Sequence, residues 1–132
     1  MLPRKILLAA DDSDDRELFR LYAAARPVPG LVHVAENGAE VIELLSDGLT
    51  GTGLPDVIVL DQNMPRKNGI ETLAELKRSP AFRAIPVFIY STYASEALRV
   101  QCLQLGALSV FQKPDSPEAY QYIIDGILRL IS

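Results

Sequence analysis

The chain has 132 residues, of which 48% are apolar and 23% are charged, and its formal net charge is −4. This length suits one domain that buries its own core without a disulfide or a zinc staple. The single cysteine and single histidine exclude a disulfide framework, a multi-cysteine or multi-histidine metal site and most histidine-based catalysis. The acidic balance argues against a nucleic-acid-binding surface. Carboxylates therefore have to carry most of any chemistry.

The N-terminal apolar run is too short for a signal-peptide core, because the acids within residues 11–15 stop it. No stretch approaches the ~18 apolar residues of a membrane span. We therefore expect a cytoplasmic protein without a membrane partner, folded as one domain over residues 1–132.

Short continuous apolar runs, typical of strands buried on both faces, alternate with segments of helical spacing. Strands are predicted at residues 5–10, 31–35, 56–60, 86–90 and 108–112. Helices are predicted at residues 14–26, 38–46, 69–78, 95–105 and 117–130, and the glycine-rich residues 48–55 are predicted to be a connecting loop. His33 is interpreted as a structural strand residue and Cys102 as a core residue.

This alternation requires right-handed crossovers and a parallel sheet that is covered on both faces. The predicted fold is an α/β, three-layer, doubly wound (βα)5 domain. Its expected strand order is the flavodoxin-like order 2-1-3-4-5, although the pattern does not exclude another order.

Polar side chains follow four of these strands, at the sheet edge where open α/β sheets bind ligands. Close carboxylates repel unless a cation lies between them, and Mg²⁺ prefers such oxygen ligands. A lysine and a hydroxyl beside Mg²⁺ form a clamp for a phosphoryl group, which a carboxylate can attack as a nucleophile. The residues in question are Asp11 and Asp12, Asp61, Ser91 and Thr92, and Lys113.

Four motifs in chain order resemble the receiver domains of two-component response regulators. Residues 61–69, DQNMPRKNG, resemble the signature D-x-x-M-P-x-x-x-G. Residues 6–18 resemble the first strand and acidic pocket of that family, residues 85–91 its switch-hydroxyl strand and residues 111–114 its lysine strand. The run of acids and the long loop before the third strand look most like stand-alone receivers that partner phytochrome-type histidine kinases.

The resemblance implies that a histidine kinase or phosphotransfer protein phosphorylates the domain, which signals by binding a partner and has no attached output domain. It implies a phosphoacceptor at Asp61, Mg²⁺ held by Asp11, Asp61 and the Asn63 carbonyl, a switch hydroxyl at Ser91 and a phosphate-binding Lys113. The bond between Lys113 and Pro114 is often cis in this family.

Two positions depart from the family pattern. Aligned without gaps, the first of two usual acids falls on Ala10 and the second on Asp11, whereas a one-residue slip would make Asp11 and Asp12 the pair. We prefer the gapless register, because the slip needs a compensating gap before the first helix. Valine replaces the usual aromatic residue at Val110, so the aromatic half of the switch is missing.

The remaining acids, Asp14 and Asp15, are expected only to cap the first helix and compensate its dipole. A separate hypothesis is that Asp12 or Asp14 substitutes in part for the missing acid. The last helix carries a wide apolar stripe, which is typical either of deep packing or of a surface for a partner or a homodimer. The predicted interaction surface consists of Tyr120, Ile124, Leu128 and Ile131.

Two rival functions stay open. The first is a degenerate receiver that binds proteins independently of phosphorylation, which the changes at Ala10 and Val110 favour. The second is a Mg²⁺-dependent phosphohydrolase with an aspartate nucleophile. Residues 61–63, DQN, argue against a phosphohydrolase, because the second acid of a D-x-D motif is absent.

Overall fold

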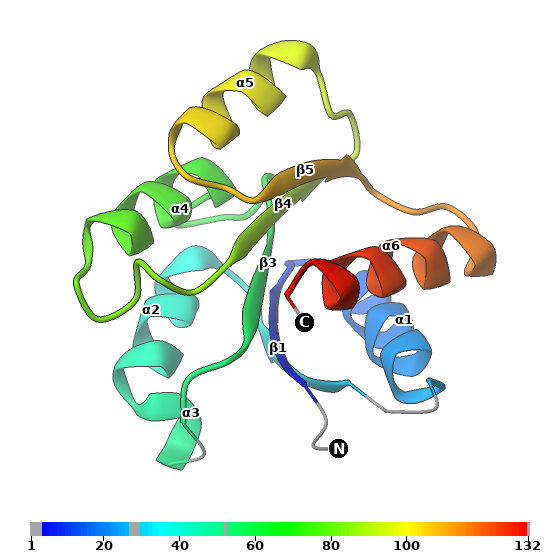
Figure 1. Cartoon of the computed structure of the whole chain (residues 1–132), viewed down its shortest axis with the longest axis horizontal. Helices are drawn as coiled ribbons and strands as arrows, with labels where there is room; N and C mark the ends of the chain where they lie inside the picture. The colour runs from blue at the N-terminus through cyan, green and yellow to red at the C-terminus, as the bar shows by residue number, and fades with distance from the viewer. Residues whose placement is uncertain (1–3, 27–29, 52, 132) are drawn as a thin grey trace.

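A parallel five-stranded sheet runs through the centre of the molecule (Figure 1). The computed structural model describes residues 4–26, 30–51 and 53–131. The strands are β1 (Lys5–Ala9), β2 (Leu31–Ala35), β3 (Val57–Asp61), β4 (Val87–Ser91) and β5 (Ser109–Gln112). They lie in the order β2-β1-β3-β4-β5, so the predicted topology is confirmed. The order reverses between β1 and β3, which is where ligands bind in sheets of this kind.

Helices cover both faces of the sheet (Figure 1). One face carries α1 (Ser13–Ala24) and α6 (Pro117–Leu130), and the other carries α2 (Gly38–Ser46), α4 (Gly69–Arg78) and α5 (Glu96–Gln104). Each of these begins and ends within two residues of its predicted bounds. Side-chain caps at Asn37, Asn68, Ser95 and Ser116 fix where four of them begin.

The predicted connecting loop at residues 48–55 contains a one-turn helix, α3 (Gly48–Gly51), which the sequence pattern did not predict. Gly48, Gly51 and Gly53 all have positive φ angles there, so the glycines do supply the turns that were expected. Position 52 lies outside the described residues.

Two apolar clusters fill the space between the sheet and its helices. Successive strand residues point to opposite faces, so β1 sends Ile6 and Leu8 toward α1 and α6, and Leu7 and Ala9 toward α2, α4 and α5. Cys102 is fully buried in the cluster that faces α2, α4 and α5, as predicted. His33 lies half-buried on the edge strand β2. None of the helices in the described ranges is long and apolar enough to cross a membrane.

Candidate functional site

The carboxyl ends of β3, β4 and β5 bring three of the predicted site residues together. Asp61 is the last residue of β3 and Ser91 the last of β4. The backbone N–H of Lys113 donates to the Ser91 carbonyl at 2.8 Å, which extends the pairing of β4 with β5 by one residue. The Lys113 Nζ atom then lies 2.8 Å from Asp61 Oδ2. The Asp61 carboxylate and the Lys113 ammonium therefore meet at this sheet edge, and Ser91 joins them there through its backbone carbonyl.

The Asp61 carboxylate is fully buried, with 0% of its side chain exposed. Its Oδ1 atom accepts a hydrogen bond from the Asn63 N–H at 3.0 Å, and its Oδ2 atom forms the ion pair with Lys113. Burial raises the pKa of Asp61 above its ordinary value, although Lys113 and the Asn63 N–H oppose the increase. The nearby Asp11 carboxylate raises this pKa further. A further positive charge beside Asp61 would therefore stabilise its ionised carboxylate.

Lys113 pairs with two carboxylates, those of Asp61 and Asp15. Its Nζ atom donates to Asp15 Oδ2 at 2.9 Å in addition to contacting Asp61. Burial alone would lower the pKa of Lys113, but the hydrogen bonds to Asp61 and Asp15 raise it overall. The expectation that Asp15 only compensates the helix dipole is wrong. Asp15 lies in the first turn of α1, directly after the end of β1, and this was the available signal that it could reach the same sheet edge.

The bond between Lys113 and Pro114 is trans, since no peptide bond in the described ranges is cis. The cis bond that the family resemblance implied is therefore absent. The lysine reaches the site nevertheless, because the backbone hydrogen bond to Ser91 sets the direction in which β5 ends.

The acids after β1 divide between two tasks. Asp12 is the N-cap of α1, where its Oδ1 atom accepts from the Asp14 N–H at 2.8 Å. Asp11 is exposed and lines an open pocket of about 430 Å³ together with the residues that follow β3. Ala10 is fully buried and belongs to the apolar core, so the first of the two usual acids is replaced by a packing residue.

The oxygen atoms at this pocket suit a hard divalent cation. Within the described residues, no group of three or more histidine, cysteine or acidic side chains is arranged to hold a metal. Protein ligands would instead be the Asp11 and Asp61 carboxylates and the backbone carbonyl of Asn63. Mg²⁺ is often bound by one or two carboxylates plus waters, and a cation here would offset the repulsion that Asp11 exerts on Asp61. The residues present therefore fit such an ion.

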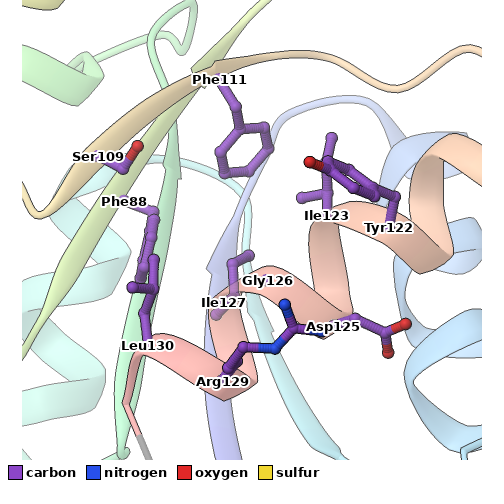
Figure 2. A pocket seen from close by; sticks show the side chains of 10 residues that line it. All are labelled: Phe88, Ser109, Phe111, Tyr122, Ile123, Asp125, Gly126, Ile127, Arg129 and Leu130. Atoms are coloured by element: carbon purple, nitrogen blue, oxygen red, sulfur yellow. The ribbon is translucent and has the colours of Figure 1, made fainter.

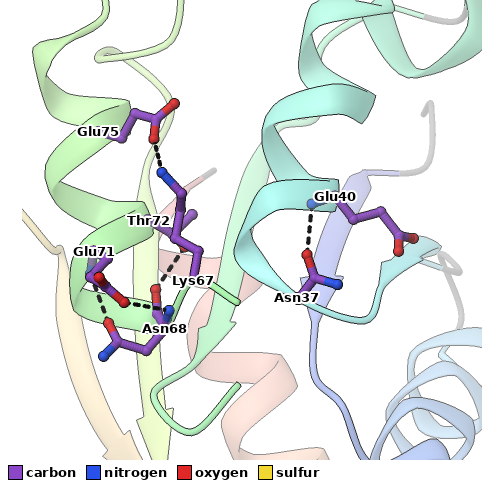
Figure 3. A network of polar contacts seen from close by, with 7 residues as sticks. All are labelled: Asn37, Glu40, Lys67, Asn68, Glu71, Thr72 and Glu75. Atoms are coloured by element: carbon purple, nitrogen blue, oxygen red, sulfur yellow. Dashed lines mark hydrogen bonds and ion pairs between the residues drawn. The ribbon is translucent and has the colours of Figure 1, made fainter. Parts of the chain in front are cut away.

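The loop that joins β3 to α4 is held by its own polar contacts (Figure 3). Asn68 and Glu71 form a reciprocal capping box, and Thr72 donates to the Asn68 carbonyl at 2.7 Å. The Lys67 ammonium pairs with Glu75 one turn further along. The capping box fixes where α4 begins, and the segment that leads to it carries the Asn63 N–H that donates to Asp61.

Tyr90 is a buried neighbour of the site that the sequence pattern did not indicate. It pairs in register with Asp61 and is only 2% exposed. Lys113 Nζ lies 5.2 Å from the centre of its ring, and Phe111 stacks on that ring at 5.6 Å. Among the described residues, nothing forms a hydrogen bond with the Tyr90 hydroxyl. Its ring thus provides an apolar floor for the lysine ammonium.

The other predicted switch residues differ in exposure. Ser91 is 5% exposed at the end of β4, whereas Thr92 is exposed beyond it. Val110 is buried in the core on the α5 side of the sheet, and its carbonyl accepts a hydrogen bond from Arg99 Nη1 at 2.6 Å. The strand that usually carries an inward-turning aromatic residue is therefore joined to α5 through its backbone.

The predicted interaction surface on α6 is wrong for three of its four residues. Tyr120, Ile124 and Leu128 are at most 7% exposed and fill the core, and the half-buried Ile131 packs against them. The stripe is wide because α6 packs on both the sheet and α1, where Tyr22 stacks on Tyr120. The exposed apolar side chains of α6 are Tyr122 and Leu130, which line a pocket of about 330 Å³ beside β5 (Figure 2).

Comparisons with known proteins agree with this geometry. A family model described as the response regulator receiver domain matches residues 6–125. The curated relatives include the transcriptional regulatory protein CpxR of Klebsiella pneumoniae subsp. pneumoniae (strain HS11286), which is 37% identical over 95% of this chain and 49% of its own length. They also include a protein-glutamate methylesterase/protein-glutamine glutaminase of Treponema denticola, matched over 30% of its length. The chain thus spans about half or less of these relatives.

Solved structures of similar size resemble the fold over nearly their whole length. The phosphorylated cyanobacterial phytochrome response regulator RcpA has a TM-score of 0.86 and 30% identity, with 97% of this chain and 93% of that chain covered. The Mn²⁺-bound form of response regulator Rcp1 has a TM-score of 0.82 and 25% identity, with 95% and 91% covered. Fold, motif order and family model agree, and the chain belongs to the response regulator receiver domain family.

Proposed function

We propose that this receiver domain accepts a phosphoryl group on Asp61 from a histidine kinase or a phosphotransfer protein, in the presence of Mg²⁺. The observation that carries the proposal is the Asp61 carboxylate at the switch point of the sheet, buried between the Asn63 N–H and the Lys113 ammonium. A carboxylate with fixed partners on both oxygens is positioned as a nucleophile. The family model and the solved structures named as response regulators support this role.

In the proposed reaction, one Asp61 carboxylate oxygen attacks the phosphorus atom of the donor. The new oxygen–phosphorus bond forms as the bond to the donor nitrogen breaks, and the electron pair leaves with that nitrogen. The Asn63 N–H holds the second carboxylate oxygen, while the Lys113 ammonium and the Ser91 hydroxyl would bind the phosphoryl oxygens as they arrive. When bound by Asp11, Asp61 and the Asn63 carbonyl, Mg²⁺ would neutralise charge on the transferred group. Hydrolysis of the aspartyl phosphate returns the domain to its starting state.

Incubation with acetyl phosphate and Mg²⁺, followed by intact mass measurement, tests this function. Wild-type protein is expected to gain the mass of one phosphoryl group, and Asp61→Asn is expected to gain none. A gain that persists in Asp61→Asn would remove Asp61 from its role. The absence of a gain in the wild type would favour the second candidate below.

The second candidate is a degenerate receiver that binds its partner without phosphorylation. It is favoured by Ala10 and Val110, two buried apolar residues at positions where the family usually has an acid and an aromatic ring. It is opposed by the complete set of Asp61, Asn63 and Lys113 contacts. Tight binding of a partner by both wild type and Asp61→Asn, without a gain in mass, would establish it.

We further propose a signalling role and not an enzymatic one on other substrates, in the cytoplasm, where the reduced thiol of Cys102 is stable. Release of inorganic phosphate from phosphate esters would instead indicate a phosphohydrolase. A homodimer through α6 draws no support from Tyr120, Ile124 and Leu128, because they are buried in the monomer. A molecular mass in solution that rises with protein concentration, or with phosphoryl donor, would establish the dimer.

A further inference from the structure

The Lys113 ammonium has two carboxylate partners at almost equal distances. Asp61 Oδ2 lies 2.8 Å from Nζ on the inner side, and Asp15 Oδ2 lies 2.9 Å from it on the outer side. The Asp61 side chain is fully buried, whereas Asp15 and Lys113 are each 20% exposed. The ammonium is therefore attracted outward by the partly exposed Asp15 as well as inward by the buried Asp61.

Helix α1 supplies the second carboxylate because β1 does not. Ala10 is buried among apolar side chains and offers no charge to the site. Asp11 lines the pocket that Asn63 and Met64 also line. Asp15 lines a different pocket of about 320 Å³, together with Pro114 and Tyr120 beyond the lysine. The two acids thus line different pockets, and Asp15 is the one that shares Lys113 with Asp61.

We propose that Asp15 is a positioning residue that holds the Lys113 ammonium at the level where the phosphoryl oxygens arrive. This inference rests on the proposed phosphorylation of Asp61. Without Asp15, Lys113 would pair with Asp61 alone, above the Tyr90 ring over which it already lies. An ammonium shared with Asp15 lowers the reactivity of the nucleophile less than an ammonium paired with Asp61 alone, and it stays closer to the incoming group.

The same contact keeps Lys113 in place after transfer. Once an Asp61 oxygen is bonded to phosphorus, the ammonium loses its inner carboxylate partner. Asp15 remains within hydrogen-bonding distance from a helix that does not take part in the transfer. The ammonium then has one acid behind it and the phosphoryl oxygens before it, which is an arrangement its three N–H donors can satisfy.

The test compares Asp15→Asn with Asp14→Asn in phosphorylation by acetyl phosphate and Mg²⁺. Asp14 lies in the same helical turn, is exposed, and contacts the Asp12 cap only through its backbone N–H. Each variant removes one negative charge and therefore weakens the repulsion of the anionic donor. Any resulting gain in donor binding is expected to be similar in the two variants. Asp15→Asn is expected to lower the limiting rate at saturating donor roughly tenfold, because a small misplacement of a catalytic group is costly. Asp14→Asn is expected to keep that rate.

Two further measurements separate positioning from folding. Asp15→Glu restores the carboxylate and is expected to recover most of the limiting rate. Thermal unfolding is expected to show that Asp15→Asn and Asp14→Asn are both fully folded at the assay temperature. Equal limiting rates for these two variants would overturn the role of Asp15 while leaving phosphorylation of Asp61 intact. If the wild type gains no phosphoryl group at all, the proposed function itself fails.

Discussion

The position that a Cβ atom would occupy on Gly69 lies 2.8 Å from the carbonyl oxygen of Asp61. The Cα atom of Gln62 is almost as near, at 2.9 Å, so the first residue of α4 packs directly on the backbone that follows β3. The neighbouring Gln62 side chain accepts a hydrogen bond from the Ile70 N–H at 2.9 Å and completes this junction. The glycine that ends the receiver signature thus has a steric cause in this chain.

Gly69→Ala is expected to destabilise the fold by about 1–3 kcal/mol, because backbone atoms that cannot move aside surround the added methyl group. Urea unfolding would measure the change. Gly126→Ala is the matched control, since a Cβ there meets nothing within 4 Å in the middle of α6. That control is expected to raise stability by up to about 1 kcal/mol through helix propensity. Equal effects of the two substitutions would contradict the packing argument.

The raised pKa of Asp61 predicts an effect of pH on stability. In the folded state, burial makes the carboxyl group bind its proton more readily than in the unfolded chain. The stability that this protonation contributes is present below the ordinary pKa of 3.8 and is lost as pH rises through the folded-state value. Asp61→Asn is therefore expected to unfold at a higher temperature than wild type at neutral pH, with the difference shrinking as pH falls. Thermal unfolding measured across pH would detect this.

The same carboxyl group must be ionised to attack phosphorus. The rate of phosphorylation by acetyl phosphate is thus expected to fall on acidification at a pH above the ordinary carboxyl range. Asp11→Asn removes one cause of the raised pKa and is expected to move this acid limb to lower pH. An unchanged limb in that variant would show that Asp11 does not act on Asp61.

Magnesium binding distinguishes the two adjacent acids that follow β1. Asp11→Asn is expected to weaken Mg²⁺ binding at least roughly tenfold, since even the loss of a residue behind a metal ligand has an effect of that size. Asp12→Asn is expected to keep the affinity within roughly twofold, because asparagine caps helices about as well as aspartate. Titration of Mg²⁺ followed by the amide NMR signal of Asn63 would measure both. Equal losses would favour the alternative register of the two acids.

The buried hydroxyl of Tyr90 predicts an unusually tolerant core substitution. Removal of a buried polar group that has no partner costs little, so Tyr90→Phe is expected to leave stability unchanged or to raise it by about 1 kcal/mol. The ring that supports Lys113 and stacks on Phe111 is retained. A loss of more than about 1 kcal/mol in urea unfolding would mean that the hydroxyl makes a contact of its own.

The fold was predictable because apolar periodicity and connection rules act along the chain. A strand buried on both faces has a continuous apolar run, as residues 57–60 show, whereas an exposed element does not require one. The convergence of Asp61, Ser91 and Lys113 followed from the same source, since parallel strands end at one edge of a sheet. The rotation of a helix about its axis is set by its neighbours and is much harder to predict.

That rotation accounts for the two main errors. The sequence indicated that Asp15 is only an acid of the first helical turn, whereas the rotation of α1 places it against Lys113. The stripe on α6 looked too wide for one sheet face, and the missing information was that α1 also packs on it, through Tyr22 and Tyr120. In both cases a second element, distant in sequence, decides which side chains are buried.

The hydrogen bond from Arg99 to the Val110 carbonyl has a consequence for the edge of the sheet. β5 is an outermost strand, and such strands present backbone groups to which another chain can add. The guanidinium occupies one of the acceptors that an added strand would need. This contact thereby makes the β5 edge less available for strand addition by another chain.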